Sequence, residues 1–361
     1  MSIIFMAHSG GGPGFLGIDL GSSEIKLVEL QAENKRPKLA TYGIISAPVS
    51  LSHDATDKEI QELGRVLKLL VEKSRCQSRH ASAALPNFAV FNAVVSFPPM
   101  KKADLERAVQ WEAKKLLNLP VEEIRLQWDV LETSKRGDKK QAGEHPFVNV
   151  LLLAAPIKVV DRYAAAFEEA GLNLVGIETE AFALERSLIG NDPAAILVVD
   201  IGGTTTDMMV VSSGIPLVNR SIQIGGKTLT DELARRLEIS PEIAEQAKRD
   251  FVGALHDQDF FIKEFDTFFG QFLNEIRYAL DLYEKQKLSY ARMDTIEKIV
   301  LTGGSSLLPT FAQYLETSLG IKTFVGDPWA RVTYPTELKS LLQEVGPRFS
   351  VAIGLAMKHI G

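Results

Sequence analysis

Apolar residues along this chain recur with two different spacings, which together predict a mixed α/β fold. Short apolar runs of strand length lie at 15–20, 39–46 and 195–201, next to polar turn residues. The segments 57–73 and 157–171 instead repeat apolar residues every three to four positions, as amphipathic helices do. At 361 residues the chain exceeds the usual size of a single core, so we expect two lobes.

A segment of about eighty residues, from 87 to 171, has a pattern of its own. It predicts strands at 89–98, 123–132 and 147–155 and helices at 101–117 and 157–171. This β-α-β-β-α order is typical of a small α+β module inserted into a larger lobe. The apolar residues of its first helix are expected to pack on the sheet of the module rather than bind a cofactor: Leu105, Ala108, Trp111 and Leu116.

The stretch "FLGIDLGSSEIKLVEL" is a strand, a polar break after Asp19 and a second strand that carries Lys26. One interpretation is a plain β-hairpin, because Asp, Gly and Ser are common turn residues. The other is a hairpin that grips phosphates, with Asp19 near a bound cation. The break consists of Gly21, Ser22 and Ser23.

A second copy of this pattern follows half a chain length later and favours the phosphate-binding interpretation. In "VVDIGGTTTD" the residue that matches Asp19 is Asp200. Two unrelated turns of the same kind at this spacing are improbable, so we expect two similar lobes that present their hairpins to a shared cleft. The second break consists of Gly202, Gly203, Thr204 and Thr205.

A third signal, "KIVLTGGSSLLP", is an apolar strand followed by glycines and a helix start. Its glycines permit close approach of the backbone, and a helix N-terminus offers free N–H groups to a sugar or phosphate. The residues concerned are Gly303, Gly304 and Ser305.

Composition and charge narrow the class of protein. The net charge of −6 and the lack of a Lys/Arg-rich run argue against a nucleic-acid binder. Cys76 is the single cysteine, so an intrachain disulfide and a cysteine zinc cluster are excluded. No apolar run reaches the ~18 residues that a spanning helix needs. We therefore expect a cytoplasmic protein without direct membrane insertion.

Taken together, the motifs resemble those of the actin-like ATPase superfamily. Residues 17–26 and 198–207 are similar to its two phosphate motifs, and residues 299–309 to its adenosine motif. Residues 175–188 and 350–360 are similar to its first and second connecting helices. Within the superfamily the chain resembles the PilM family of type IV pilus assembly proteins, and next the FtsA family of cell-division proteins. The insert "FPPMKKADLERAVQWEAKKLLNLPVEEI" and the segment "LNEIRYALDLYE" are similar to PilM. FtsA proteins end in an amphipathic membrane helix, whereas this sequence stops at Gly361, which favours PilM.

The resemblance implies a two-lobed, ribonuclease H-like actin fold with an SHS2-like insert. The expected boundaries are a flexible leader 1–14, the first lobe 15–86 and 172–198, the insert 87–171, the second lobe 199–350 with a helical subdomain at about 226–297, and a returning helix 351–361.

The resemblance also implies ATP or ADP as cofactor, with Mg²⁺ held by Asp19 and Asp200 mostly through water. Turn amides of both breaks would cradle the phosphates, Lys26 would supply a point charge, and the third motif would hold the adenosine. Glu180 matches the residue that orients the attacking water, and Asp200 completes the catalytic pair. Ala181 stands where relatives often have proline, so we expect slow hydrolysis at most.

The function implied is a cytoplasmic, ATP-binding component of type IV pilus assembly. A PilN-like inner-membrane protein would recruit it through an N-terminal cytoplasmic peptide, held between the first lobe and the insert. A pilus motor ATPase, a platform protein and a second copy of the chain are further partners that the resemblance admits. The alternatives are an FtsA-like filament-forming division protein and a small-molecule kinase of the same superfamily.

Overall fold

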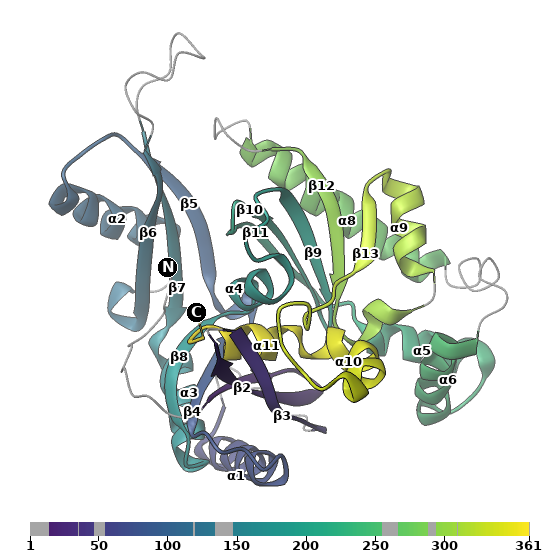
Figure 1. Ribbon diagram of the computed structural model, residues 1–361. Coiled ribbons are helices and arrows are strands. Elements are labelled where there is room, and N and C mark those ends of the chain that lie inside the picture. Colours follow the sequence, from purple (N-terminus) through teal and green to yellow (C-terminus); the bar gives the residue numbers. More distant parts are fainter. Residues whose placement is uncertain are drawn as a thin grey trace.

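The structure is a computed structural model, shown in Figure 1. It describes residues 14–34, 36–46, 55–117, 120–133, 147–254, 266–287, 294–308 and 310–360. The predicted leader therefore lies almost wholly outside the described residues. Within the described ranges, every helix is too short or too polar to span a lipid bilayer.

The first lobe is built on a five-stranded sheet with the order β3-β2-β1-β4-β8. β1 pairs antiparallel with β2 and parallel with β4, so a hairpin and a crossover meet at the central strand. The strands are β1 Phe15–Leu20, β2 Glu24–Glu33, β3 Arg36–Ser46, β4 His80–Leu85 and β8 Asn173–Thr179.

The second lobe repeats this topology in a sheet with the order β11-β10-β9-β12-β13. β9 occupies the place of β1, pairing antiparallel with β10 and parallel with β12. The duplication predicted from the two hairpins is therefore present in the fold. The strands are β9 Ala195–Ile201, β10 Thr206–Ser212, β11 Ile215–Ile222, β12 Ile296–Thr302 and β13 Lys322–Val325.

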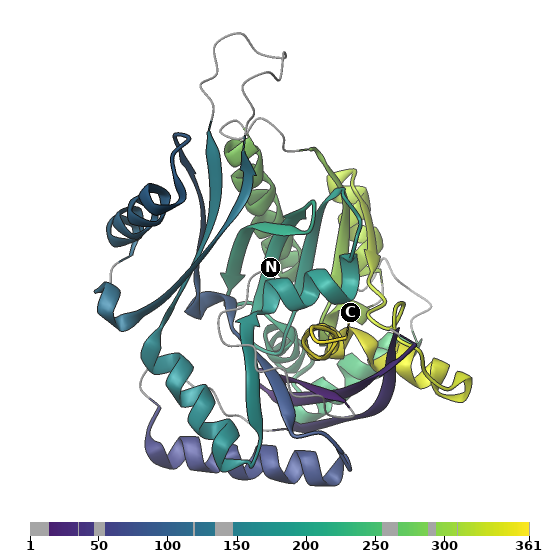
Figure 2. The same cartoon turned by 60° about the vertical axis from the view of Figure 1, so that its left-hand side comes forward.

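Helices cover the outer face of each sheet. The first lobe has α1 Asp57–Lys73 and α3 Ile157–Glu169, which lie side by side (Figures 1 and 2). In the second lobe α8 Asp266–Lys287 and α9 Phe311–Leu319 pack on the sheet, and α5 Gly226–Leu237 and α6 Pro241–Ala254 pack on each other to one side of it (Figure 1). Thr56 and Glu59 form a reciprocal capping box that fixes the start of α1. The predicted helix 57–73 therefore begins and ends where the structure has α1.

Two further helices fill the space between the sheets. They are α4 Glu180–Leu184, continued by the π-helical turn η3 Glu185–Ile189, and α11 Ser350–Met357. Val351 and Leu355 of α11 pack with the second lobe, whereas Ala352, Ile353 and Ala356 pack with the first. A helix that is apolar all round can only be buried, and α11 is buried from Ser350 to Ala356. The short α10 Lys339–Val345 leads into it.

The insert forms a three-stranded antiparallel sheet with the order β5-β7-β6, and α2 covers its outer face (Figure 2). Leu105 and Val109 of α2 pack against Val150 and Leu152 of the sheet. The expectation that Trp111 also packs there was wrong, because its side chain is 61% exposed and Lys115 Nζ lies 3.2 Å from its ring centroid. The elements are β5 Phe91–Phe97, α2 Lys102–Leu116, β6 Ile124–Thr133 and β7 Val148–Pro156.

The tightest contact between layers is that of β1 with α11. A Cβ atom added to Gly17 would lie 1.9 Å from the carbonyl oxygen of Ala352 and 2.5 Å from the nitrogen of Ala356. Both are backbone atoms, so no side chain can move aside. We predict that Gly17→Ala lowers the free energy of unfolding by roughly 3 kcal/mol or more, measured by denaturant unfolding.

Gly270→Ala in α8 is the matched control for Gly17→Ala. An added Cβ there meets no atom within 4 Å. Alanine in a helix interior is favoured over glycine, so this variant should gain up to about 1 kcal/mol. Equal stability of the two variants would contradict the close approach of α11 to β1.

Candidate functional site

The two predicted hairpins meet at the same end of the two sheets. In the first, Asp19 stands opposite Lys26 across the β1–β2 ladder. In the second, Asp200 stands opposite Asp207 across the β9–β10 ladder. The two hairpins thus have the same register, and the residue opposite the aspartate is a lysine in the first lobe and an aspartate in the second.

The tips of the hairpins touch each other across the gap between the lobes. The Thr204 hydroxyl donates to Ser22 Oγ at 2.8 Å. A Cβ added to Gly203 would lie 2.3 Å from Ser23 Oγ, so the second tip has no room for a side chain. Gly21 is likewise confined, because its added Cβ would lie 2.9 Å from Lys26 Nζ. Both tips therefore require glycine, because neighbouring side chains fill the space that a Cβ would need.

The third motif lies beside the second hairpin. Gly303 has φ +84°, and an added Cβ would lie 2.4 Å from Asp200 Oδ1, so both conformation and space require glycine there. The Gly303 N–H donates to the carbonyl of Pro347, which anchors the motif just before α11. Gly304 begins the short 3₁₀ turn η4 Gly304–Leu307. Ser305 Oγ lies 2.4 Å from an added Cβ of Gly226.

The first residues of α5 donate hydrogen bonds to the second tip. The Gly226 N–H donates to the Gly202 carbonyl at 2.9 Å, and the Lys227 N–H donates to the Gly203 carbonyl at 2.8 Å. The Gly202 N–H donates to the Thr205 carbonyl, which closes the turn. These bonds satisfy amides that a helix start would otherwise leave free.

Lys26 is the cation at the centre of this arrangement. Its Nζ lies 3.3 Å from Asp19 Oδ2, and only 16% of its side chain is exposed. Burial lowers the pKa of Lys26, but Asp19, Asp200 and Glu24 outweigh burial and raise it. Lys26 is thus a charged, inward-facing lysine rather than a solvent-facing one.

Carboxylates surround the lysine. Burial, followed by the charges of Asp207 and Asp19, raises the pKa of Asp200 to about 7, although Lys26 opposes this. Burial and the same two aspartates raise the pKa of Glu180 well above its ordinary value. Burial also raises the pKa of Asp207. Three of the four carboxyl groups therefore have raised pKa values, because the site holds more carboxylates than its single lysine can balance.

Asp207 and Asn87 belong to this site and were missed in the sequence. Asn87 Nδ2 donates to Asp207 Oδ1 at 3.2 Å, and the Ser221 hydroxyl donates to the same oxygen. The Asn87 N–H also donates to Glu180 Oε2 at 3.4 Å. A signal for Asp207 was present, because it follows Asp200 by the same seven positions that separate Lys26 from Asp19.

Further charged residues border the site. Arg348, just before α11, donates from Nη2 to Glu24 Oε1 and so pairs the two lobes beside the first hairpin. Lys248 of α6 donates to the carbonyl of Gly226 at 3.0 Å and to Thr230 Oγ1 at 2.9 Å. Neither residue stands in a motif that the sequence marked. Among the described residues, no three His, Cys, Asp or Glu side chains are grouped as a metal would need.

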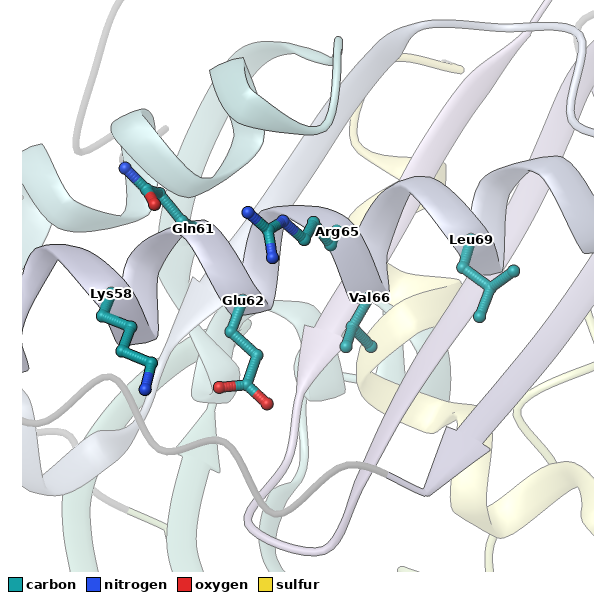
Figure 3. A pocket seen from close by; sticks show the side chains of 6 residues that line it. All are labelled: Lys58, Gln61, Glu62, Arg65, Val66 and Leu69. Atoms are coloured by element: carbon teal, nitrogen blue, oxygen red, sulfur yellow. The ribbon is translucent and has the colours of Figure 1, made fainter.

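A separate hollow lies along the outer face of α1 (Figure 3). The side chains that line it come from that single helix: Lys58, Gln61, Glu62, Arg65, Val66 and Leu69. None of them belongs to either hairpin or to the acidic cluster, so the hollow is not the site described above.

Comparison with known proteins identifies the family. Residues 17–360 match the model of the family described as type IV pilus assembly protein PilM. The chain belongs to this family. A chain of a PilM–PilN type IV pilus biogenesis complex is 28% identical, with a TM-score of 0.78, and the match covers 96% of this chain and 98% of that one.

More distant proteins support the fold of the PilM family. MreB 5 of Spiroplasma citri, solved with AMPPNP, is 15% identical with a TM-score of 0.51, covering 96% of this chain and 95% of that chain. The predicted actin-like two-lobed fold is therefore confirmed. The cell division protein FtsA of Neisseria meningitidis serogroup B is 26% identical over 281 residues. The match covers 70% of this chain, which spans only 66% of the length of that relative.

The raised pKa of Asp200 predicts how stability depends on pH. The folded protein binds this proton up to about pH 7, whereas an unfolded aspartate loses it near pH 4. The folded state is therefore favoured in acid, and the advantage is lost as the pH rises through about 7. We predict that Asp200→Asn stabilises the ligand-free protein by on the order of 2 kcal/mol at pH 8, and by less towards pH 5.

Asp192→Asn is the control with the opposite sign. The hydrogen bond from Lys298 Nζ lowers the pKa of Asp192, so this variant should lose stability at pH 8 rather than gain it. Urea unfolding between pH 5 and pH 8 measures both effects. A gain for Asp200→Asn that does not depend on pH would contradict the assignment.

Proposed function

We propose that this chain is a nucleotide-binding, actin-like component of type IV pilus assembly that links a membrane partner to the nucleotide state of its cleft. The observation that carries the proposal is the pair of hairpins at Asp19 and Asp200, within a chain whose residues 17–360 match the PilM family. The family match supports a role in pilus assembly, and the two hairpins support nucleotide binding.

The residues of the site suit a phosphate chain with a divalent cation. Gly21 and Gly203 carry no Cβ at the two tips, so backbone amides there would be able to approach anionic oxygens, as oriented amides do in other phosphate sites. The surplus of carboxylates that raises the pKa of Asp200 and Glu180 is what a bound cation would relieve. Mg²⁺ binds through few carboxylates and retains water, which fits a site without a close group of ligands.

Each lobe contributes its own part to the proposed site. Asp19 and Asp200 would hold Mg²⁺ mostly through water, and Lys26 would balance phosphate charge beside Asp19. The bound cation would neutralise phosphate charge. The segment Gly303–Ser305 would border the sugar, next to Gly226. Glu180, half-buried between Asp207 and Asp19, would orient water, and its raised pKa leaves less of it in the ionised form that can accept a proton.

We predict that the protein binds ATP in the presence of Mg²⁺ and that Asp19→Ala and Asp200→Ala each weaken this binding at least tenfold. The reason is the loss of a carboxylate that faces the cation. Isothermal titration measures the affinities, and phosphate release by the wild-type protein alone should stay far below the ~10 per second typical of enzymes.

Asp161→Ala is the matched control for ATP binding. Asp161 is an exposed aspartate on α3, outside both hairpins in the sequence, so its removal should leave the affinity unchanged. Wild-type affinity in both hairpin variants would place the nucleotide elsewhere.

For the partner, we propose the N-terminal cytoplasmic peptide of a PilN-like inner-membrane protein, which would recruit the chain to the inner face of that membrane. A PilM chain similar over 96% of this one was solved as a PilM–PilN complex. The proposed region is 87–171 where it borders the first lobe. An extended peptide can pair along an edge strand and fill alternate pockets with apolar side chains. In the three-stranded sheet, β5 and β6 are the outer strands.

Deleting the insert is a poor test of the peptide site. Leu151, Leu153 and Phe167 of this region belong to the core of the first lobe, so the deletion would open that core. Hydrogen–deuterium exchange on the intact chain avoids this problem.

We predict that a synthetic peptide of the PilN-like protein lowers exchange in one of the two outer strands, β5 or β6, because an extended peptide protects the edge amides of the strand with which it pairs. The helices α5 and α6 serve as the internal control and should not change. Protection found only in the second lobe would contradict the proposed region.

A further inference from the structure

Asn87 occupies the point where the candidate site, the second lobe and the root of the insert meet. It is 8% exposed and begins the short 3₁₀ turn η1 Asn87–Ala89. Its side-chain amide donates to Asp207 of the second lobe, and its backbone N–H donates to Glu180 of the first connecting helix. One residue therefore joins three parts of the molecule that are far apart in the sequence.

The position of Asn87 follows from the strand pairing. β4 and β8 are parallel neighbours, with Leu85 opposite Thr179. Asn87 and Glu180 follow these two strands, so they lie side by side at the carboxyl ends of β4 and β8. The first strand of the insert, β5, begins only four residues after Asn87. A displacement of Asn87 is thus passed directly to the insert, because the connection is too short to absorb it.

The second lobe meets the insert at β11. η1 and β5 both pack against β11, and Ser221 of β11 donates to the same oxygen of Asp207 as Asn87 does. Two amide side chains on these strands are poorly satisfied within the described part of the chain. Both amide atoms of Asn92 in β5, and Oδ1 of Asn219 in β11, are buried without a hydrogen-bond partner. Unpartnered buried groups disfavour the conformation that holds them.

The contact between the insert and β11 is therefore one that a small change in energy can shift. The hydrogen bond from Asn87 to Asp207 stabilises this contact, and the buried, unpartnered amide atoms of Asn92 and Asn219 destabilise it. Asp207 stands opposite Asp200 across the β9–β10 ladder, so it belongs to the same hairpin as the proposed ligand of the cation. A ligand that shifts this hairpin therefore also shifts the acceptor of the hydrogen bond from Asn87.

We propose that Asn87 is a positioning residue that couples the occupancy of the nucleotide site to the contact between the insert and β11. This rests on the proposed function, because it assumes a nucleotide in the cleft and a peptide on the insert. Coupling between two sites is reciprocal, so it can be measured from either ligand.

The test compares Asn87→Ala with Ser221→Ala in the full chain. Both variants remove one donor to Asp207, but only the first removes a bond between the lobes. The probes are Mg·ATP and the synthetic PilN-like peptide, and the readout is the ratio of peptide affinities with and without nucleotide. We expect a ratio of about fivefold or more in the wild type and in Ser221→Ala, and a ratio within about twofold of one in Asn87→Ala.

Asn87→Asp serves as a second variant should Asn87→Ala unfold. It keeps the shape of the side chain but replaces the donor with a second acceptor, and it should lose the coupling as well. A ratio of one in the wild type, an unchanged ratio in Asn87→Ala, or an equal loss in Ser221→Ala would each overturn the proposal.

A measurement without ligands separates this inference from the proposed function. In the ligand-free protein, hydrogen–deuterium exchange in β5 should rise in Asn87→Ala and remain at the wild-type rate in Ser221→Ala. Failure of the wild type to bind ATP or peptide would refute the proposed function. Equal exchange of β5 in both variants would refute the role of Asn87 whatever the ligands do.

Discussion

The close packing of α4 and α11 between two sheets is the constraint on which the rest of the structure depends. Gly17 lets the backbone of α11 touch β1, and Gly354 lets α11 touch α4, since an added Cβ there would lie 1.9 Å from the carbonyl oxygen of Ala183. Val351 and Leu355 of α11 then pack with the second sheet. Because this seam leaves so little space, it fixes the position of one lobe relative to the other. Asp19, two residues after Gly17, thereby faces Asp200.

A rigid seam of this kind explains how the carboxylates stay together. Asp19, Glu180, Asp200 and Asp207 share a single lysine, and three of them have raised pKa values. A pliable site would relax by moving these groups apart into water. Here each carboxylate is on a strand or at a helix start whose backbone is fixed by its neighbours. The ligand-free protein therefore bears an electrostatic cost at the place where a cation is expected to bind.

The features that repeat in the sequence were predictable, whereas those that depend on long-range pairing were not. Asp19 and Asp200 were found because the same pattern occurs twice, and α1 because its apolar spacing is a local signal. Asn87 belongs to no motif in the sequence. Its position depends on the pairing of β4 with β8 and on its contact with Asp207 of the second lobe. Trp111 was misplaced because helical spacing does not show which face of α2 meets the sheet, and there Val109 is buried instead.

The attachment of the insert to the first lobe determines how a ligand bound between the lobes would affect it. One face of its sheet contributes Leu151 and Leu153 to the core of the first lobe, and the other face is covered by α2. The insert is thus fastened to the first lobe, and it meets the second through β5, η1 and β11. A ligand shifts a conformational equilibrium only through its different affinity for the two states. Relative motion of the lobes would therefore change this contact, which a peptide bound to the insert and the first lobe would encounter.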